Sequence, residues 1–476
     1  MPRSNRHVAD WPEPFEPPGL DPPPAEARDN TRTPLDDESP WPKGFIEWFV
    51  VSQTAIPAML YLPGSQAYRL PLRIGAYAIA LFGFGLWWFG RSAKSPARHP
   101  AQRWLLLVLG CLVLMISHPL TNSLLAGIAQ TLLYFAIFCP LFWAPGWVNR
   151  PRQLVRILAI LLVCNGVNSM VGVLQVYDPD RWMPRELSFV YTEGSDARAA
   201  ATYMGPNGRP IIRPPGLFDT PGAVCGPGTL AALLGLVFAL EPFPWWKRAA
   251  ALTFSFAGIS AIYLSHVRAN FVVTIGMMVI YAGLLSTQRQ KTRAAAFTMT
   301  SVGLVAFGLS AATLLGGESI QQRFSSLLEE DPRTVYYKNR GEQVEYAFNK
   351  LIGDYPFGAG LARWGMMRGY FGDPAHFDST ELWAEIQPNA WIMDGGIFLL
   401  GLYGVALLVT VGYEWRLIRM IRDPDDKLWA TAIVAANCGT LALLFTFVPF
   451  ATQVGLQFWF LEGALHGAIA SRLKPE

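Results

Sequence analysis

Charged residues are scarce in this sequence. They make up 15% of its 476 residues, whereas hydrophobic residues make up 52%, and a soluble domain carries about 25% charged residues. Long stretches such as Leu105–Met115 and Val272–Leu285 contain no charge at all. These apolar runs exclude an array of soluble domains and indicate an integral membrane protein.

The sequence also lacks the motifs of metal and nucleotide sites. Its five cysteines show no C-x-x-C spacing, and its six histidines show no H-E-x-x-H spacing. A P-loop, a Rossmann fingerprint and a nucleophile elbow are absent as well. We therefore expect no metal and no cofactor, and any group transfer must draw on an already activated donor. The net charge of +3, without a basic stripe, excludes a nucleic-acid partner.

The N-terminal segment differs from the rest of the chain. Residues 1–42 are polar and rich in proline, which predicts a disordered cytoplasmic tail and no cleavable signal peptide. Residues 43–476 then form a polytopic membrane domain. The domain organisation is thus a tail followed by one membrane domain.

The apolar segments predict an all-α fold. A bilayer core needs about 20 apolar residues per helix. That length predicts about twelve transmembrane helices, near residues 45–64, 70–90, 103–118, 121–146, 155–176, 222–240, 248–265, 269–287, 294–315, 391–413, 429–448 and 452–471.

Positive charge alternates between the connections. Alternate short connections carry clusters of arginine and lysine, such as Arg289, Lys291 and Arg293, and short basic connections stay in the cytoplasm. We therefore expect both termini to be cytoplasmic. Two long connections, at 177–221 and 316–390, are predicted on the opposite face. The second contains short helices, because Val344, Ala347, Phe348 and Leu351 follow helical spacing before the run at 354–360 ends it.

Three arginines stand out on that opposite face. Arg213 precedes a Pro-Pro-Gly segment, Arg268 opens the eighth predicted span, and Arg340 lies four residues before Val344, on the apolar face of its helix. Arginine binds pyrophosphate oxygens bidentately and stays charged, so the three are candidate pyrophosphate ligands. Each also has a structural alternative. Arg213 would brace a loop, Arg268 would mark the lipid boundary, and Arg340 would pair with Glu342 or Glu345.

The arrangement of spans, loops and arginines resembles the O-antigen polymerase and ligase superfamily of bacterial envelope enzymes over about residues 100–470. Four segments carry the resemblance: Arg213-Pro-Pro-Gly-Leu-Phe, Leu-Ser-His-Val-Arg268, Arg340 upstream of Tyr-Pro-Phe-Gly-Ala-Gly-Leu, and Pro-Asn389-Ala-Trp-Ile-Met-Asp-Gly-Gly. The resemblance implies an inner-membrane protein of about twelve helices with a large periplasmic loop and a periplasmic active site. It further implies metal- and nucleotide-independent glycosyl transfer from undecaprenyl pyrophosphate to an acceptor sugar hydroxyl, in lipopolysaccharide or exopolysaccharide biosynthesis.

One departure from the family concerns the general base. The family often has His-Asn at the start of the tenth span, and this chain has Pro388-Asn389, which favours a polymerase over a ligase. His376, Glu381 and Glu385 in the long loop are the candidate catalytic bases. His266 and Asn389, which lie within the resembling segments, are further candidate site residues.

Two other functions remain open. A transporter for a small anion or a lipid-linked glycan would also place arginines at a membrane face, although no inverted repeat is evident. A non-catalytic scaffold of a polysaccharide-assembly complex would explain the missing histidine. The expected partners are an undecaprenyl-pyrophosphate-linked glycan, a glycan or lipid acceptor, membrane lipids and other polysaccharide-assembly proteins.

Overall fold

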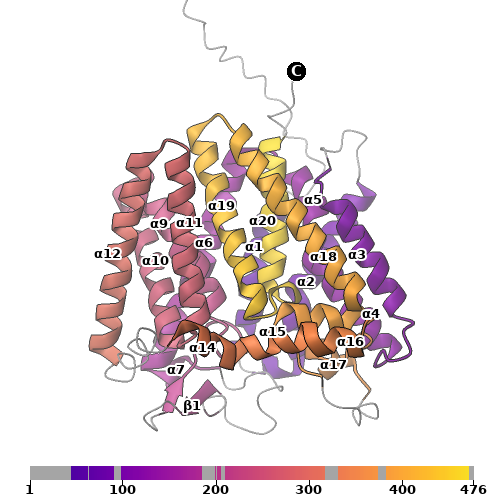
Figure 1. The fold of residues 1–476 in the computed structure, drawn as a ribbon. Helices are drawn as coiled ribbons and strands as arrows, with labels where there is room; N and C mark the ends of the chain where they lie inside the picture. The colour runs from indigo at the N-terminus through magenta and orange to yellow at the C-terminus, as the bar shows by residue number, and fades with distance from the viewer. Residues whose placement is uncertain are drawn as a thin grey trace, which may run out of the picture. The chain divides into compact units, whose positions relative to one another are not determined.

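The computed structural model contains one compact unit within residues 44–476, and the unit is almost entirely helical (Figure 1). The described residues are 44–62, 64–90, 98–184, 199, 201–204, 210–316, 331–373 and 382–470. The predicted tail at 1–42 and two candidate bases, His376 and Glu381, lie outside these ranges.

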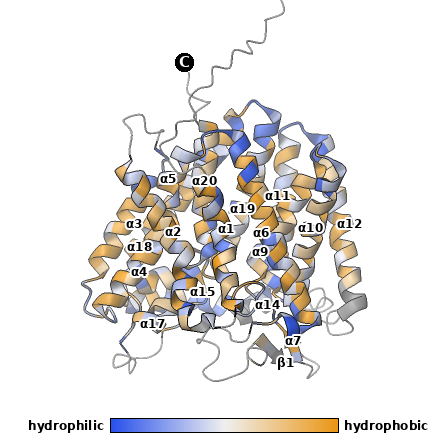
Figure 2. Ribbon diagram, turned by 180° about the vertical axis from the view of Figure 1, so that it is seen from behind, coloured by the Kyte–Doolittle hydropathy of each residue, from blue (hydrophilic) through white to orange (hydrophobic). Residues whose placement is uncertain are grey.

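Eight helical segments of the described chain are long and apolar enough to cross a membrane. Apolar residues fill most of their length and polar residues gather mainly near their ends (Figure 2). The chain is therefore a multi-pass membrane protein. The segments are α2 (Arg69–Phe89), α4 with α5 (Leu124–Phe138 and Pro140–Trp147), α6 (Pro151–Tyr177), α10 (Trp245–Ser265), α11 (Arg268–Thr287), α12 (Lys291–Gly316), α18 (Gln387–Met420) and α19 (Pro424–Ala442).

The four remaining predicted spans also form helices, but shorter ones. At 14 residues, α1 and α3 extend only about 21 Å, which is less than the ~30 Å of a bilayer core. The count of twelve spans thus stays a prediction. These helices are α1 (Phe45–Ala58), α3 (Gln102–Met115), α9 (Cys225–Leu240) and α20 (Gln453–Ala470).

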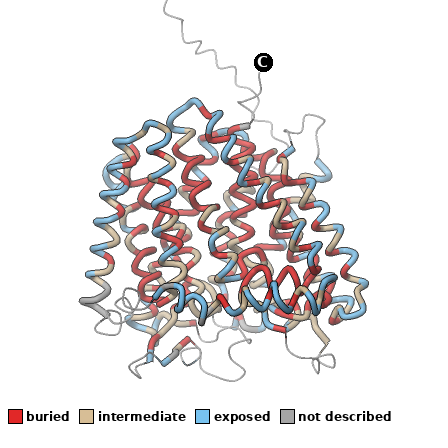
Figure 3. The backbone as a smooth tube through the Cα atoms, viewed as in Figure 1, coloured by how far each residue is buried: buried red, intermediate tan, exposed pale blue. Residues whose placement is uncertain are grey.

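Close packing of small residues places α9 at the centre of the bundle. A Cβ atom on Gly258 of α10 would come 2.5 Å from the carbonyl oxygen of Gly228 in α9. Helices within a membrane commonly pack through such close backbone contacts, because the hydrophobic effect does not drive association between helices in lipid. Both α9 and α20 are buried along most of their length, whereas α12 exposes many side chains (Figure 3). The interior of the domain therefore lies around α9 and α20.

Short elements gather at one end of the bundle, which we call the loop face (Figure 1). It carries an antiparallel pair of short strands and a helical run that ends at Asp354, where the sequence predicted a stop. Ala347 and Leu351 of that run are buried as expected, but Phe348 is exposed. The elements are α7 (Pro179–Trp182), β1 (Thr202–Met204), β2 (Pro210–Ile212), α14 (Pro332–Tyr336), η3 (Tyr337–Gly341), α15 (Glu342–Tyr346), η4 (Ala347–Leu351), α16 (Ile352–Asp354) and α17 (Gly365–Phe371).

Helix α18 is broken near its start, and the loop after α16 fills the break. Gly395 and Gly396 have non-helical backbone angles. The N–H of Ile397 donates to the carbonyl of Pro356 at 3.0 Å, and the N–H of Ala359 donates to Met393 at 2.7 Å. Two of the segments that carry the family resemblance therefore pack against each other, and this contact anchors the loop face on the bundle.

Short helical turns complete the connections: η1 (Met59–Tyr61), η2 (Ser65–Tyr68), η6 (Leu443–Phe445) and η7 (Pro449–Ala451).

The charge of the connections predicts the orientation of the loop face. Reporter fusions after residues 95 and 290 should report the cytoplasm, because their connections are basic, and fusions near residues 200 and 350 should report the periplasm. Alkaline phosphatase and green fluorescent protein fusions provide the measurement. A cytoplasmic signal at residue 350 would contradict the predicted orientation.

Candidate functional site

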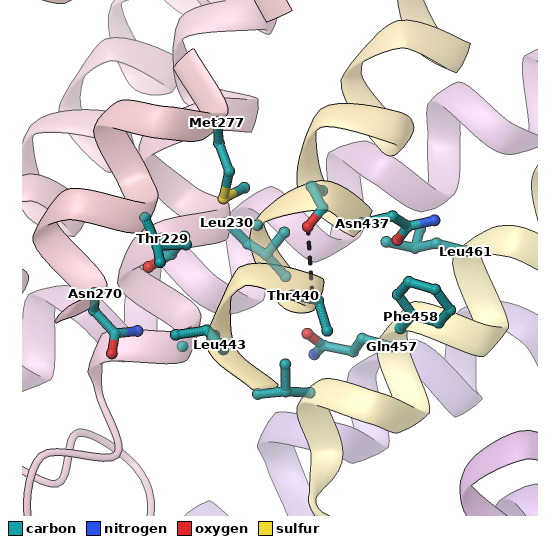
Figure 4. A pocket seen from close by; sticks show the side chains of 15 residues that line it. Thr229, Leu230, Asn270, Met277, Asn437, Thr440, Leu443, Gln457, Phe458 and Leu461 are labelled. Atoms are coloured by element: carbon teal, nitrogen blue, oxygen red, sulfur yellow. Dashed lines mark hydrogen bonds between the residues drawn. The ribbon is translucent and has the colours of Figure 1, made fainter. Parts of the chain in front are cut away.

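A cavity opens between four helices of the bundle interior (Figure 4). The space inside it that water-sized molecules can reach is about 30 Å³. Thr229 and Asn270 lie on one wall, and Asn437 and Gln457 lie on the other. The lining residues come from α9, α11, α19 with η6, and α20. The cavity therefore combines an apolar lining with a small number of amide and hydroxyl groups, as ligand sites commonly do.

Arg268 is the first residue of α11, one of the helices that line this cavity. His266 ends α10 with a positive φ of 57°, and the chain then turns directly into α11. The Oγ of Ser265 lies 2.9 Å from the Sγ of Cys225, so the turn packs against the start of α9. Two residues after Arg268, Asn270 lines the cavity. The positive φ and burial of His266 are accounted for by the turn it forms.

Arg213 is positioned by a loop that α6 holds tightly. The N–H of Gly216 donates to Gln175 at 2.9 Å, and the N–H of Leu217 donates to Asn168 at 2.9 Å. Gly216 has a φ of 66°, and a Cβ there would come 2.0 Å from the Asn168 amide oxygen, so only glycine fits. The Arg213 charge acts electrostatically on Cys225, at the start of α9. The loop thus holds Arg213 beside the same helix end as the turn that precedes Arg268.

Two arginines that the sequence reasoning missed hold the other end of this loop. The Nε atoms of Arg69 and Arg73 lie 3.3 Å and 3.1 Å from the same carboxylate oxygen of Asp219. Arg73 also donates to the hydroxyl of Tyr370 at 3.2 Å, which joins the loop to α17. In the sequence, Asp219 directly follows the Arg213-Pro-Pro-Gly-Leu-Phe segment. Nothing in the sequence predicts its pairing with Arg69, 150 positions earlier.

Arg340 forms an ion pair with Glu385, one of the candidate bases. The Nε of Arg340 also donates to the carbonyl of Thr446 at 3.1 Å, just after η6. The alternative pairing with Glu342 or Glu345 is therefore wrong for the described structure. Glu345 instead accepts a hydrogen bond of 2.5 Å from the Tyr337 hydroxyl.

The Glu385 carboxylate is surrounded by donors. In addition to Arg340, it accepts hydrogen bonds from Gln343 at 2.6 Å and from Trp383 at 2.8 Å. These donors occupy lone pairs of the carboxylate that a base needs to accept a proton. As the structure stands, Glu385 therefore orients Arg340, and its proposed role as a base requires that some of these bonds open.

A tyrosine next to this ion pair stays protonated. Burial raises the pKa of the Tyr336 hydroxyl, and the Arg340 charge opposes that rise. The hydroxyl donates to the carbonyl of Phe445 at 3.3 Å. Arg340 and Tyr336 together tie the helical run of the loop face to the connection between α19 and α20.

Asn389 lies in the first turn of α18, after Pro388, where the sequence placed it. Its side chain is buried, and within the described part of the chain its amide oxygen has no hydrogen-bond partner. Two residues earlier, Gln387 accepts a hydrogen bond of 2.8 Å from the Phe450 N–H. The start of α18 therefore sits against η7, close to the point at which Arg340 is held.

The three arginines come from distant parts of the sequence. Each acts on, is bound to, or lies a few residues from a segment that supplies a lining residue of the cavity: Gly226 for Arg213, Asn270 for Arg268, and Leu443 for Arg340. A Cβ on Gly226 would lie 3.5 Å from Val454, so the starts of α9 and α20 also touch here.

Helix ends reinforce this charge. The helices α9, α11, α18 and α20 all begin at the loop face (Figure 1). The positive ends of their dipoles, together with the arginines, favour an anion at the loop face.

No group of His, Cys, Asp and Glu in the described chain is placed to hold a metal ion. No protein-family model and no curated protein matches this sequence.

Proposed function

We propose that this protein is a membrane glycosyltransferase that moves a glycan from undecaprenyl pyrophosphate to an acceptor sugar hydroxyl, as a polysaccharide polymerase or an O-antigen ligase. The observation that carries the proposal is that Arg213, Arg268 and Arg340 each act on, contact or lie in a segment that adjoins or lines one cavity, at the loop face, where four helices also begin. A pyrophosphate linked to a lipid would be met there by bidentate donors at the membrane surface.

The main contribution of the protein to the proposed reaction is the positive charge of the three arginines. In the proposed reaction the acceptor oxygen forms a bond to the anomeric carbon, and the bond from that carbon to the pyrophosphate oxygen breaks. The pyrophosphate leaves with the electron pair, so negative charge grows where the arginines lie, and they stabilise the transition state. The proton of the acceptor hydroxyl passes to a base or to the departing phosphate.

The direct test is an assay of the purified protein with a lipid-linked oligosaccharide and an acceptor. We expect longer or transferred glycan together with free undecaprenyl pyrophosphate in equal amounts. Reconstitution in vesicles separates the other two candidates. A transporter would move the intact lipid-linked glycan or a small anion without cleavage, and a scaffold would do neither.

The next prediction concerns the general base, for which the long loop supplies the candidates. His376→Ala is expected to lower turnover by at least about 10²-fold with little change in donor binding, because an imidazole titrates near neutral pH and suits proton transfer. Turnover and donor binding are measured separately, so that a loss of the chemical step is distinguished from a loss of affinity.

Glu381→Gln and Glu385→Gln are the matched comparisons. A loss confined to Glu385→Gln would assign proton transfer to the carboxylate that pairs with Arg340. Full activity in all three variants would show that none of these loop residues acts as the base.

A transporter is the second candidate, because ionisable groups also occur deep in the bundle. Glu414 and Glu462 are buried within α18 and α20, and both accept hydrogen bonds from Asn437, which lines the cavity. Buried carboxylates are typical of ion-coupled transport.

A further inference from the structure

A second polar cluster lies in the bundle beyond the inner wall of the cavity. Glu414 of α18 and Glu462 of α20 are 1% and 0% exposed, and both carboxyl groups approach the same amide nitrogen, that of Asn437, at 2.5 Å and 3.4 Å. Glu462 is the tenth of the 18 residues of α20, so it sits near the middle of that helix. Carboxyl groups at such depth are costly and are retained mostly where they bind an ion or a proton.

Two buried carboxyl groups this close to each other are expected to share a proton. If both were ionised, two negative charges would repel each other in a medium of low dielectric. The pair therefore holds one proton that either oxygen can carry, as coupled acids in other buried pairs do.

A histidine orients one member of the pair. The Nδ1 of His99 accepts the N–H of Ala101 at 3.2 Å, so in the neutral ring the proton sits on Nε2. That Nε2 lies 2.9 Å from an oxygen of Glu462, to which it donates. His99 and Glu462 are both fully enclosed by protein. A neutral donor held in this way supports a single ionised carboxylate and leaves the other carboxyl to carry the proton.

Asn437 connects this cluster to the cavity. Its amide nitrogen donates to Glu414 at 2.5 Å and approaches Glu462 at 3.4 Å, and the same side chain lines the cavity wall (Figure 4). An occupant that engages the Asn437 amide would weaken these bonds to the carboxylates. Binding of the occupant would then change the proton affinity of the carboxyl groups. Protonation of the carboxyl groups would change the affinity for the occupant by the same factor, because coupling between two binding sites is reciprocal.

Other titratable groups surround the pair. Tyr413 interacts with Glu462, and Cys438 interacts with Glu414. The Nδ1 of His466 lies 2.6 Å from the Tyr413 hydroxyl, and the ring centroids of His466 and His99 are 5.3 Å apart. Helix α5, which touches α20 beside Gly463, brings no titratable side chain.

The geometry favours a proton over a metal ion. Amide and imidazole N–H groups point at the carboxylate oxygens and occupy positions that a cation would need, and no metal-holding group occurs in the described chain. We infer that Glu414 and Glu462 form a proton-binding site inside the helix bundle and that Asn437 links its protonation to the cavity. The inference does not depend on which ligand the cavity takes.

Infrared difference spectroscopy of the purified full-length protein, titrated with acid and base, tests the site. We expect a protonated-carboxyl band from a buried group that is lost in Glu414→Gln and in Glu462→Gln but retained in Glu342→Gln, an exposed carboxyl outside the cluster. Gel filtration shows whether each variant is folded, and Glu462→Asp, which keeps a carboxyl, should retain a shifted band. A band unchanged in both Gln variants would overturn the proton site.

Asn437→Leu tests the link to the cavity. Removal of its N–H groups destabilises the ionised carboxylate, so the midpoint of the band's titration should move to higher pH by about one to two pH units, a 10–100-fold change in proton affinity. Asn270→Leu, on the opposite wall of the cavity, is the matched control and should leave the midpoint in place. Equal midpoints in wild type and Asn437→Leu would show that the cavity and the proton site are not linked through this residue.

Discussion

Glycan transfer should fall to background when Arg213, Arg268 and Arg340 are all replaced by lysine. Each single change is expected to lower turnover by about 10²–10³-fold, the usual cost of removing one donor that stabilises transition-state charge. Lysine keeps the positive charge but loses the planar fork that binds two phosphate oxygens together. The assay is release of free undecaprenyl pyrophosphate by purified protein.

The controls separate this effect from general damage. Arg333→Lys changes an exposed arginine of α14, on the same face and close to Arg340 in sequence, and should leave turnover unchanged. Arg340→Lys also tests the ion pair with Glu385, so its melting temperature is measured alongside. Near-normal product from all three single variants, with intact folding, would rule out a pyrophosphate clamp, and the arginines would then be structural.

Gly396→Ala should prevent the domain from folding stably. Gly396 has a φ of 63° and a ψ of −153°, a conformation that is essentially confined to glycine. A Cβ there would lie 2.1 Å from the carbonyl oxygen of Pro356, which is backbone and cannot swing away. Strain and overpacking together should cost about 2–5 kcal/mol of unfolding free energy.

A matched pair of substitutions sharpens this test. Gly401→Ala and Gly404→Ala lie in the same helix, and nothing stands within 4 Å of the added atom, so both should leave stability equal or slightly higher. Thermal unfolding followed by fluorescence in detergent gives the comparison. A Gly396→Ala protein that melts with the wild type would mean that the loop and the break in α18 do not depend on each other.

A buried carboxyl completes the contact that Gly396 permits. Asp394, two residues before Gly396, accepts hydrogen bonds from Tyr134 at 2.7 Å, from Trp364 at 3.0 Å and from Gln130 at 3.2 Å. These partners belong to α4 and to the segment before α17. The Asp-Gly-Gly of the sequence is therefore a junction between a bundle helix and the loop face.

The sequence also contains ionisable residues within its apolar spans, and the predicted site residues did not include them. Asp394 and Glu462 stand within largely apolar stretches of α18 and α20, and Glu414 follows the apolar stretch of α18. An ionisable residue in such a place is by default a candidate functional or organising group. The predicted site residues were instead arginines near the span ends and residues of the long loop. The sequence shows the three carboxyl groups, but it does not show their hydrogen-bond partners.

The sequence by itself determined the class of the protein. Long apolar runs predicted an all-α membrane protein, and hydrogen bonds within each helix depend on local composition, so their positions could be read directly. The end of the helical run at Asp354 was predicted in the same way, whereas the tenth span, predicted from residue 391, begins four residues earlier, at Gln387. The common membrane face of Arg213, Arg268 and Arg340 stays a prediction from the sequence.

Only the tertiary structure decided which of these residues meet. The Arg340–Glu385 pair spans 45 residues, and the His99–Glu462 pair spans 363. Side-chain partners at such separations depend on how the helices pack, and no spacing in the sequence encodes that packing. The cavity and the carboxyl pair behind Asn437 both depend on how the helices pack, which includes close approaches at small residues such as Gly228 and Gly258.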